Sequence, residues 1–324
     1  MLGLQDGYTI DARRLITYAG TDSSGFAKAE KRLAIFCNIH VAENTIKSLC
    51  DKEAPKMLKW QENAPVSWHK FDLAEGALEF TTDGTCVNTT EGWKEMRIGI
   101  FSKREPGEAA LSTEWDSRHL PRPHVAIAFA EIAEKDEFRK RWGYWGNRLE
   151  IENYRELSAL GDGAPWIWDA VLLEFDGQAQ ENLDIYHALE YLSGKGDLLF
   201  GKSTVEYTVW YDTMKRDLLE GGPKPLLDRL ALMDTAEWPK EQKEAHRLLT
   251  NYLENHSGRM NYRSRLAAGQ SIGSGQVEGA CRHMIGARLK QTGAKWRRDR
   301  VNRMGVLCSI YYGDQWNDYW KTAK

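Results

Sequence analysis

The chain has 324 residues, of which 42% are hydrophobic, and a formal net charge of −3. This length is enough for a buried core and suggests two domains, or one domain with a large insertion. A charge this close to zero argues against a general nucleic-acid coat protein, but it does not exclude DNA binding, because local patches of charge matter more than the sum. The five cysteines form no CxxC pair, which excludes a Cys-rich zinc ribbon within the chain and indicates no disulfide framework. Since no apolar leader and no membrane-length apolar run is visible, we expect a cytoplasmic protein without a membrane partner.

Residues 1–75 are predicted to form an N-terminal helical segment. Apolar residues between positions 24 and 53 recur at intervals of three and four, the spacing of one helix face. The break at residues 38–41 makes the segment a candidate helix-turn-helix. Such a unit either reads DNA or only packs, and short motifs of this kind give many false positives.

Residues 76–192 are predicted to form the first part of a mixed α/β (α+β) core. Extended runs at 78–89, 93–103 and 124–132 indicate a three-stranded antiparallel meander. A helix over 134–147, a strand within 154–163, a helix over 164–175 and a short strand at 183–186 that leads into a helix complete the pattern. The predicted order is β-β-β-α-β-α-β-α.

Residues 193–270 are predicted to be an entirely helical insertion. Gly221-Gly222-Pro223 is a strong helix stop, because glycine accepts a left-handed cap and proline prevents continuation. Residues 271–324 then hold a helix with a carboxylate in its first turn, followed by a basic C-terminal segment. Ser274 is the expected N-cap of that helix.

Three carboxylates stand where a metal site could form: Asp83 in the first strand, Asp162 after the fourth and Glu278 in the late helix. Asp-Gly after a strand is first of all a turn signal. If the first and fourth strands are neighbours, however, the three side chains can meet. Carboxylates that lie close together stay ionised only when a cation neutralises them. Two Mg²⁺ ions bound by such carboxylates can cut a phosphodiester.

Asp184 and His187 form a D-x-x-H pair at the start of a helix. One interpretation is a helix cap with a satisfied histidine. Another is that the pair holds the metal ligands in place without binding the metal itself. A third is that Asp184 replaces Asp162 as a ligand. The sequence leaves this choice open, with Asp162 preferred.

A run of positive charge follows Glu278, with one acid among its members. Side chains of this kind contact phosphates, and the resulting affinity falls steeply with salt. A tryptophan within the run either stacks on a base or anchors the core. The candidate DNA-binding residues are Arg282, His283, Arg288, Lys290, Lys295, Trp296, Arg297, Arg298, Arg300 and Arg303.

Several blocks together resemble the DDE transposases of ISKra-type bacterial insertion sequences. The most specific is the block from Gly273 to His283, and the others are Asp83-Gly84-Thr85, Gly161-Asp162-Gly163-Ala164-Pro165-Trp166 and Leu183-Asp184-Ile185-Tyr186-His187. The resemblance implies an RNase H-like core with a helical insertion before the last catalytic residue. It implies DNA cleavage and strand transfer with two Mg²⁺ ions, for which Mn²⁺ can substitute, held by Asp83, Asp162 and Glu278, with Asp184 and His187 as the D-x-x-H pair. The implied partners are double-stranded DNA (element ends and target) and further copies of the chain, in a bacterial, nucleoid-associated setting.

Two alternatives remain at this stage. Family members also carry cysteine pairs before the helical segment, and this sequence has none, so the chain can instead be a remnant or domesticated copy that binds DNA without cutting it. The thirteen tryptophans and the acidic residues also suit a glycoside hydrolase. That hypothesis needs two carboxylates about 5–10 Å apart without a metal, and it leaves the basic run unexplained.

Overall fold

The structure, a computed structural model, describes residues 7–323. The first six residues of the predicted segment 1–75, and Lys324, lie outside the described residues. The chain forms two compact units. Unit 1 comprises the described residues up to Lys103, then Pro123–Asn153 and the described residues from Gly275 onward; unit 2 comprises Arg104–Arg122 and Tyr154–Ser274. The predicted segment 1–75 therefore falls in unit 1 and the insertion 193–270 in unit 2, whereas the predicted core 76–192 is shared between them.

Unit 1 begins with three helices, α1 (Ile10–Asp22), α2 (Phe26–Cys37) and α3 (Glu43–Asn63). The break predicted at 38–41 is present: α2 ends where Asn38 takes a left-handed conformation, with φ 52°. Helices α1 and α3 approach closely at Gly20, where an added Cβ would lie 2.5 Å from the Cys50 sulfur. The buried carboxylate of Glu53 on α3 accepts from Arg13 on α1, so a charged contact as well as packing holds this helical group together.

The strands of unit 1 are β1 (Ala77–Thr89), β2 (Gly92–Arg104) and β3 (Val125–Glu131), close to the predicted extended runs. Two residues join β1 to its neighbour β2, as in a tight hairpin. β2 pairs antiparallel with β3, with Ile100 opposite Ala128. Because β2 lies between two strands and both its faces are covered, its residues from Met96 to Lys103 are all buried.

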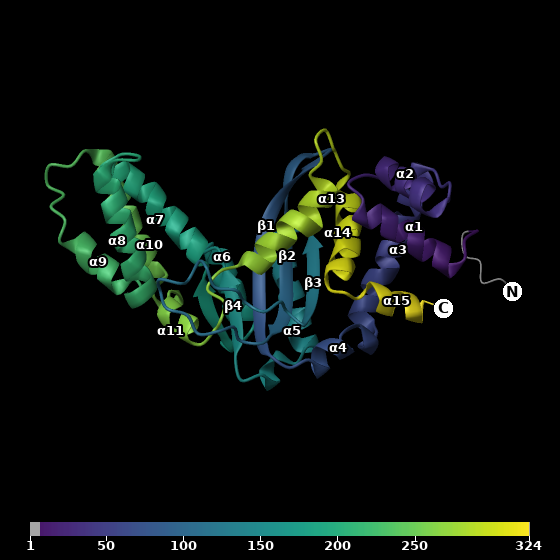
Figure 1. The fold of residues 1–324 in the computed structure, drawn as a ribbon, viewed down its shortest axis with the longest axis horizontal. Helices are drawn as coiled ribbons and strands as arrows, with labels where there is room; N and C mark the ends of the chain where they lie inside the picture. Colours follow the sequence, from purple (N-terminus) through teal and green to yellow (C-terminus); the bar gives the residue numbers. More distant parts are fainter. Residues whose placement is uncertain (1–6, 324) are drawn as a thin grey trace. The chain divides into compact units, whose positions relative to one another are not determined.

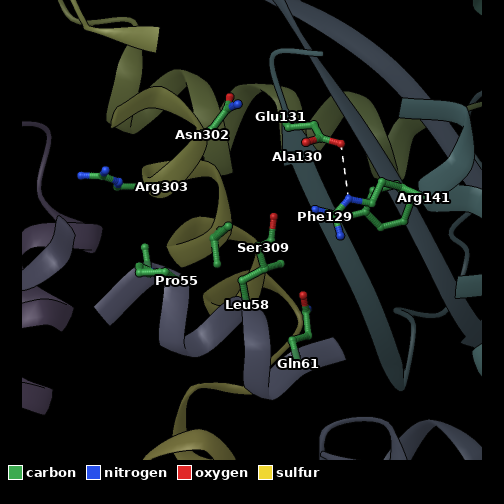
Figure 2. Close-up of a pocket in the computed structure, with 12 residues that line it drawn as sticks. Pro55, Leu58, Gln61, Phe129, Ala130, Glu131, Arg141, Asn302, Arg303 and Ser309 are labelled. Carbon is green, nitrogen blue, oxygen red and sulfur yellow. Dashed lines mark ion pairs between the residues drawn. The ribbon is translucent and has the colours of Figure 1, made fainter. Parts of the chain in front are cut away.

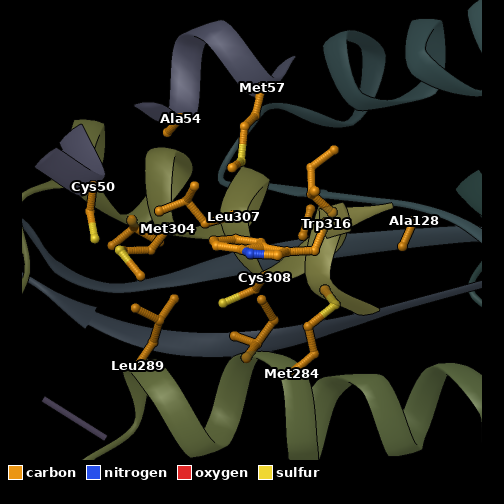
Figure 3. Packing of buried hydrophobic residues seen from close by; sticks show 14 of the residues in the cluster. Cys50, Ala54, Met57, Ala128, Met284, Leu289, Met304, Leu307, Cys308 and Trp316 are labelled. Atoms are coloured by element: carbon orange, nitrogen blue, oxygen red, sulfur yellow. The ribbon is translucent and has the colours of Figure 1, made fainter. Parts of the chain in front are cut away.

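The remaining helices of unit 1 build its core around these strands. Helix α4 (His69–Leu73) precedes β1 and α5 (Lys135–Arg148) follows β3. The C-terminal part adds α12 (Gly275–Ala280), a π-helix (Cys281–Gly286), α13 (Ala287–Leu289), α14 (Arg298–Tyr312) and α15 (Trp316–Thr322). Helix α14 packs on β3 and α3, while α12 and the π-helix pack on β1. Figure 3 shows part of the resulting apolar cluster, with Met57, Leu307 and Trp316 among its members.

Unit 2 contains two parallel strands, β4 (Leu157–Gly161) and β5 (Ala179–Leu183), which pair in register from Leu157 opposite Ala179. Helix α6 (Pro165–Glu174) connects them, and α7 (Ile185–Phe200) follows β5. The prediction of a strand at 183–186 was wrong. Only Leu183 belongs to β5, since Asp184 accepts a hydrogen bond from Tyr186 N and thereby caps α7.

The predicted insertion is helical, as expected. It holds the end of α7, then α8 (Val205–Gly221), α9 (Lys224–Ala231), α10 (Lys240–Asn255) and α11 (Tyr262–Ala267). Helix α7 packs against α8 and α10 (Figure 1). The predicted stop is confirmed: α8 ends at Gly221, and Gly222 has φ 66°. The chain is thus a mixed α/β protein with antiparallel and parallel strands. None of the helices in residues 7–323 is both long and apolar enough to cross a membrane.

Candidate active site

Asp83 and Glu278 approach the same thiol in unit 1. Asp83 lies in the middle of β1, and its Oδ2 is 3.5 Å from the Cys281 sulfur. Glu278 is exposed on α12, three residues before Cys281, so the two side chains share one face of the helix. Burial raises the pKa of Cys281 most, and the negative charges of Asp83 and Glu278 raise it further. The fold therefore brings two of the three predicted ligands to one place, although 198 positions separate Asp83 from Cys281.

The helix widens directly after Glu278. Residues Cys281–Gly286 form a π-helix, in which the N–H of Ala287 bonds to the carbonyl of Arg282, five residues earlier. Such turns are rare and occur frequently at functional sites. Here the wide turn carries the thiol that contacts Asp83.

Asp162 lies in unit 2, immediately after β4, where its Oδ1 accepts from Ala164 N at 2.9 Å. The Asp-Gly turn signal was therefore right. Gly163 has φ 91°, and a Cβ there would lie 2.9 Å from a Leu183 methyl carbon. The side chain of Asp162 is half-buried, and its second oxygen has no protein partner within residues 7–323. The second carboxylate oxygen of Asp162 is therefore available to bind a cation.

Asp184, also in unit 2, has a carboxylate that is already saturated. It is 2% exposed, and Oδ1 accepts from Tyr186 N at 2.7 Å. Oδ2 accepts from both the N–H, at 3.0 Å, and the hydroxyl of Ser274, and it lies 3.4 Å from His187 Nδ1. Burial alone raises the pKa of Asp184, but these hydrogen bonds outweigh burial and lower it below its ordinary value. Asp184 is thus a buried anchor, whereas Asp162 keeps one carboxylate oxygen without a protein partner within residues 7–323.

Ser274 precedes α12 as predicted, but its hydroxyl donates to Asp184. The buried Arg265 helps to hold the same stretch of chain, with its Nε on the carbonyl of Ser271 at 2.7 Å and Nη2 on the Ser158 hydroxyl at 2.6 Å. Sequence reasoning missed this network. Arg265 stands in a helical insertion, where no local pattern marks a buried arginine.

An aromatic and basic group lies beside the turn at Asp162 in unit 2. An added Cβ on Gly163 would lie 3.4 Å from His256 Nε2. The ring of His256 packs edge-on against Trp168 and Tyr252. Burial, together with the nearby positive charge of Arg259, lowers the pKa of His256 to about 4. A neutral imidazole therefore adjoins the residue after Asp162.

The residues of the basic run fall into two groups, those with buried side chains and those with exposed side chains. Arg288, predicted to contact DNA, is 2% exposed: its Nε donates to Gly20 O, and its guanidinium lies over the rings of Phe26 and Trp296. Trp296 is half-buried, donates its indole N–H to Leu289 O and packs against the apolar cluster of unit 1, which favours the core-anchor alternative over base stacking. The burial of Arg288 corrects the prediction that it contacts DNA, because a sequence shows the charge of a side chain but not whether the fold covers it.

The side chains of the other basic residues are partly or fully exposed. Arg300 pairs with Asp51 at 2.8 Å, and Arg303 approaches the same carboxylate at 3.6 Å. Lys290 donates to the Thr85 hydroxyl, two residues after Asp83, which places a positive charge beside the carboxylate pair of unit 1. The side chains of Arg282, His283, Lys290, Lys295, Arg297 and Arg298 are exposed.

The carboxylates of Asp83, Asp162 and Glu278 have the oxygen chemistry that Mg²⁺ prefers. Within the described part of the chain, no three side chains of His, Cys, Asp or Glu are grouped so as to hold a metal ion. Asp83 and Glu278 belong to unit 1 and Asp162 to unit 2. The gathering of all three therefore stays a prediction.

Comparison with known proteins assigns no family. No protein-family model matches the chain, and no curated protein matches it significantly. Function must accordingly be argued from the residues themselves.

Proposed function

We propose that the chain is the RNase H-like catalytic core of a DDE transposase, which cuts DNA and transfers the strand. The observation that supports the proposal is at Cys281 in unit 1: its thiol donates to Asp83, and the negative charges of Asp83 and Glu278 both raise its pKa. Two carboxylates near one point disfavour each other's ionised form, and a bound cation, in addition to the nearby Lys290, would stabilise both. The third ligand in this proposal is Asp162, whose second oxygen has no protein partner within residues 7–323.

The residues of the chain divide the work. Asp83, Asp162 and Glu278 would hold two Mg²⁺ ions. Those ions, when bound, activate the attacking oxygen and stabilise the leaving oxygen of an in-line phosphoryl transfer. Asp184 holds Ser274, the last residue of unit 2 before the helix that carries Glu278. The exposed side chains from Arg282 to Arg298 hold the phosphates of double-stranded DNA, and the protein acts as a dimer or larger assembly on that DNA.

The experiment is a nicking assay on supercoiled plasmid with Mg²⁺ or Mn²⁺. Asp83→Asn, Asp162→Asn and Glu278→Gln should each reduce cutting about a thousandfold or more, because in metal-assisted phosphoryl transfer the bound ions supply most of the rate. DNA binding in a gel-shift assay should persist. Asp169→Asn, which changes an exposed aspartate on α6, is the matched control and should cut like the parent.

The outcomes separate the hypotheses. Cutting retained by one of the three variants removes that residue from the ligand set. A parent protein that shifts DNA but never nicks it with either metal supports the alternative of a DNA-binding remnant.

A further inference from the structure

A cavity of about 260 Å³ lies within unit 1, between α3, β3 and α14 (Figure 2). Its walls are mainly apolar, with Leu58 from α3, Phe129 from β3 and Val306 from α14 among them. An apolar cavity of roughly 150 Å³ is enough to hold benzene. This one therefore has room for a molecule of two fused rings.

Two buried polar atoms have hydrogen-bonding capacity to spare in this cavity. Ser309 is 1% exposed, and its hydroxyl has no partner in the described part of the protein. Gln61 donates its amide nitrogen twice, to Ala128 O at 3.3 Å and to Gln315 Oε1 at 2.7 Å, which leaves its own amide oxygen for another donor. Figure 2 shows both side chains on the cavity wall. A buried hydroxyl without a partner costs about 1–3 kcal/mol, so a ligand that bonds to it recovers free energy.

The charged side chains of the lining are already neutralised by protein partners. Arg141 pairs with Glu62 and, at 3.4 Å, with Glu131, the contact drawn as a dashed line in Figure 2. Arg303 approaches Asp51 at 3.6 Å and Asp299 at 3.7 Å. A charged ligand would have to displace one of these pairs. A neutral ligand can bind without displacing any of these ion pairs.

We propose that this cavity binds a small neutral cyclic amide of one or two rings. The ring lies among Leu58, Phe129 and Val306. Its N–H donates to the amide oxygen of Gln61, and its carbonyl accepts from the hydroxyl of Ser309. None of its lining residues is a carboxylate of the proposed active site, and the inference does not depend on the proposed function.

The test uses oxindole as the probe, titrated into the full chain and followed by calorimetry and by two-dimensional NMR. Indole lacks the carbonyl and 1-methyloxindole lacks the N–H. Ser309→Ala should weaken oxindole about three- to tenfold, the effect of one hydrogen bond, and should change indole by less than about twofold. Leu58→Trp, which fills the cavity, should abolish binding of both. Ser48→Ala, at an exposed position on the same helix α3, is the matched control and should bind like the parent.

Two results overturn the proposal. One is the absence of saturable oxindole binding up to its solubility limit. The other is equal binding of oxindole, indole and 1-methyloxindole by the parent and by Ser309→Ala, because the two polar atoms then recognise nothing. Circular dichroism of each variant establishes that a loss of binding is not a loss of fold.

Discussion

The carboxylates of the two units differ in how far the protein itself satisfies them. In unit 2, Asp184 is buried, and Tyr186, Ser274 and His187 surround both of its oxygens. In unit 1, Glu278 is exposed, and no hydrogen bond or ion pair of its side chain is found within residues 7–323. A saturated carboxylate stabilises structure, whereas an open one beside a second acid is available to a cation. The number of protein donors on each oxygen, rather than the presence of an acid, separates the two roles.

The variant Asp184→Asn gives the strongest test of this difference between saturated and open carboxylates. An asparagine cannot accept all the hydrogen bonds that the carboxylate accepts, and it leaves buried donors unsatisfied. We expect a loss of about 3–4 kcal/mol in the free energy of unfolding. Urea denaturation followed by circular dichroism measures it. Asp162→Asn serves as the control and should change stability by less than about 0.5 kcal/mol; equal losses in the two variants would contradict the distinction.

The next test applies the same reasoning to two arginines of unit 1. Arg288→Ala removes a hydrogen bond to Gly20 O and the contacts with two aromatic rings, so it should cost about 2–3 kcal/mol of stability. Arg282→Ala, at an exposed position, should leave stability within about 0.5 kcal/mol. It should instead weaken DNA binding and reduce the slope of affinity against salt by about one.

Thermal melting and a salt titration of DNA affinity distinguish the two arginine variants. If Arg288→Ala were as stable as the parent and lost only DNA affinity, the assignment of Arg288 to the core would be wrong.

The smallest expected effect concerns pH. His256 has a folded-state pKa of about 4, below the ordinary value of 6.5, so the unfolded chain binds a proton first as the pH falls. Stability from this group is present above about pH 6.5 and is lost as the pH approaches 4, by about 1–2 kcal/mol. In His256→Gln this part of the acid dependence should disappear. Melting temperatures measured between pH 4 and 7.5 give the result, and identical pH profiles for parent and variant would refute it.

Much of the fold could be predicted from the sequence because the strands of unit 1 show local alternation of apolar residues. Met96, Ile98 and Ile100 alternate along β2, and the structure begins and ends β1, β2 and β3 within a residue or two of the prediction. The strand β5 could not be placed. Its sequence, Ala179–Leu183, holds three polar residues in succession and no apolar alternation, and the apolar residues that suggested a strand, Ile185 and Tyr186, begin α7 instead.

The candidate site was predictable in part. The family resemblance pointed to Asp83 and Glu278. The structure places Asp83 against Cys281, which lies one helical turn after Glu278, a spacing that the sequence already contains. Enclosure could not be foreseen, because it depends on residues far away in the chain. Arg288 is covered by Phe26, and Asp184 is bonded to Ser274, 90 positions later. For the same reason the sequence alone could not separate Asp162 from Asp184.

The division of unit 1 into separate stretches has a consequence for the order of events on the ribosome. Unit 2 has all of its residues once Ser274 has emerged, whereas α14, which packs on β3 and α3, is translated later. Until then the apolar sides of β3 and α3 on which α14 packs lack that helix. The nascent chain therefore passes through a stage in which all residues of unit 2 have been made and apolar surface on β3 and α3 is still uncovered, the kind of surface that a chaperone binds.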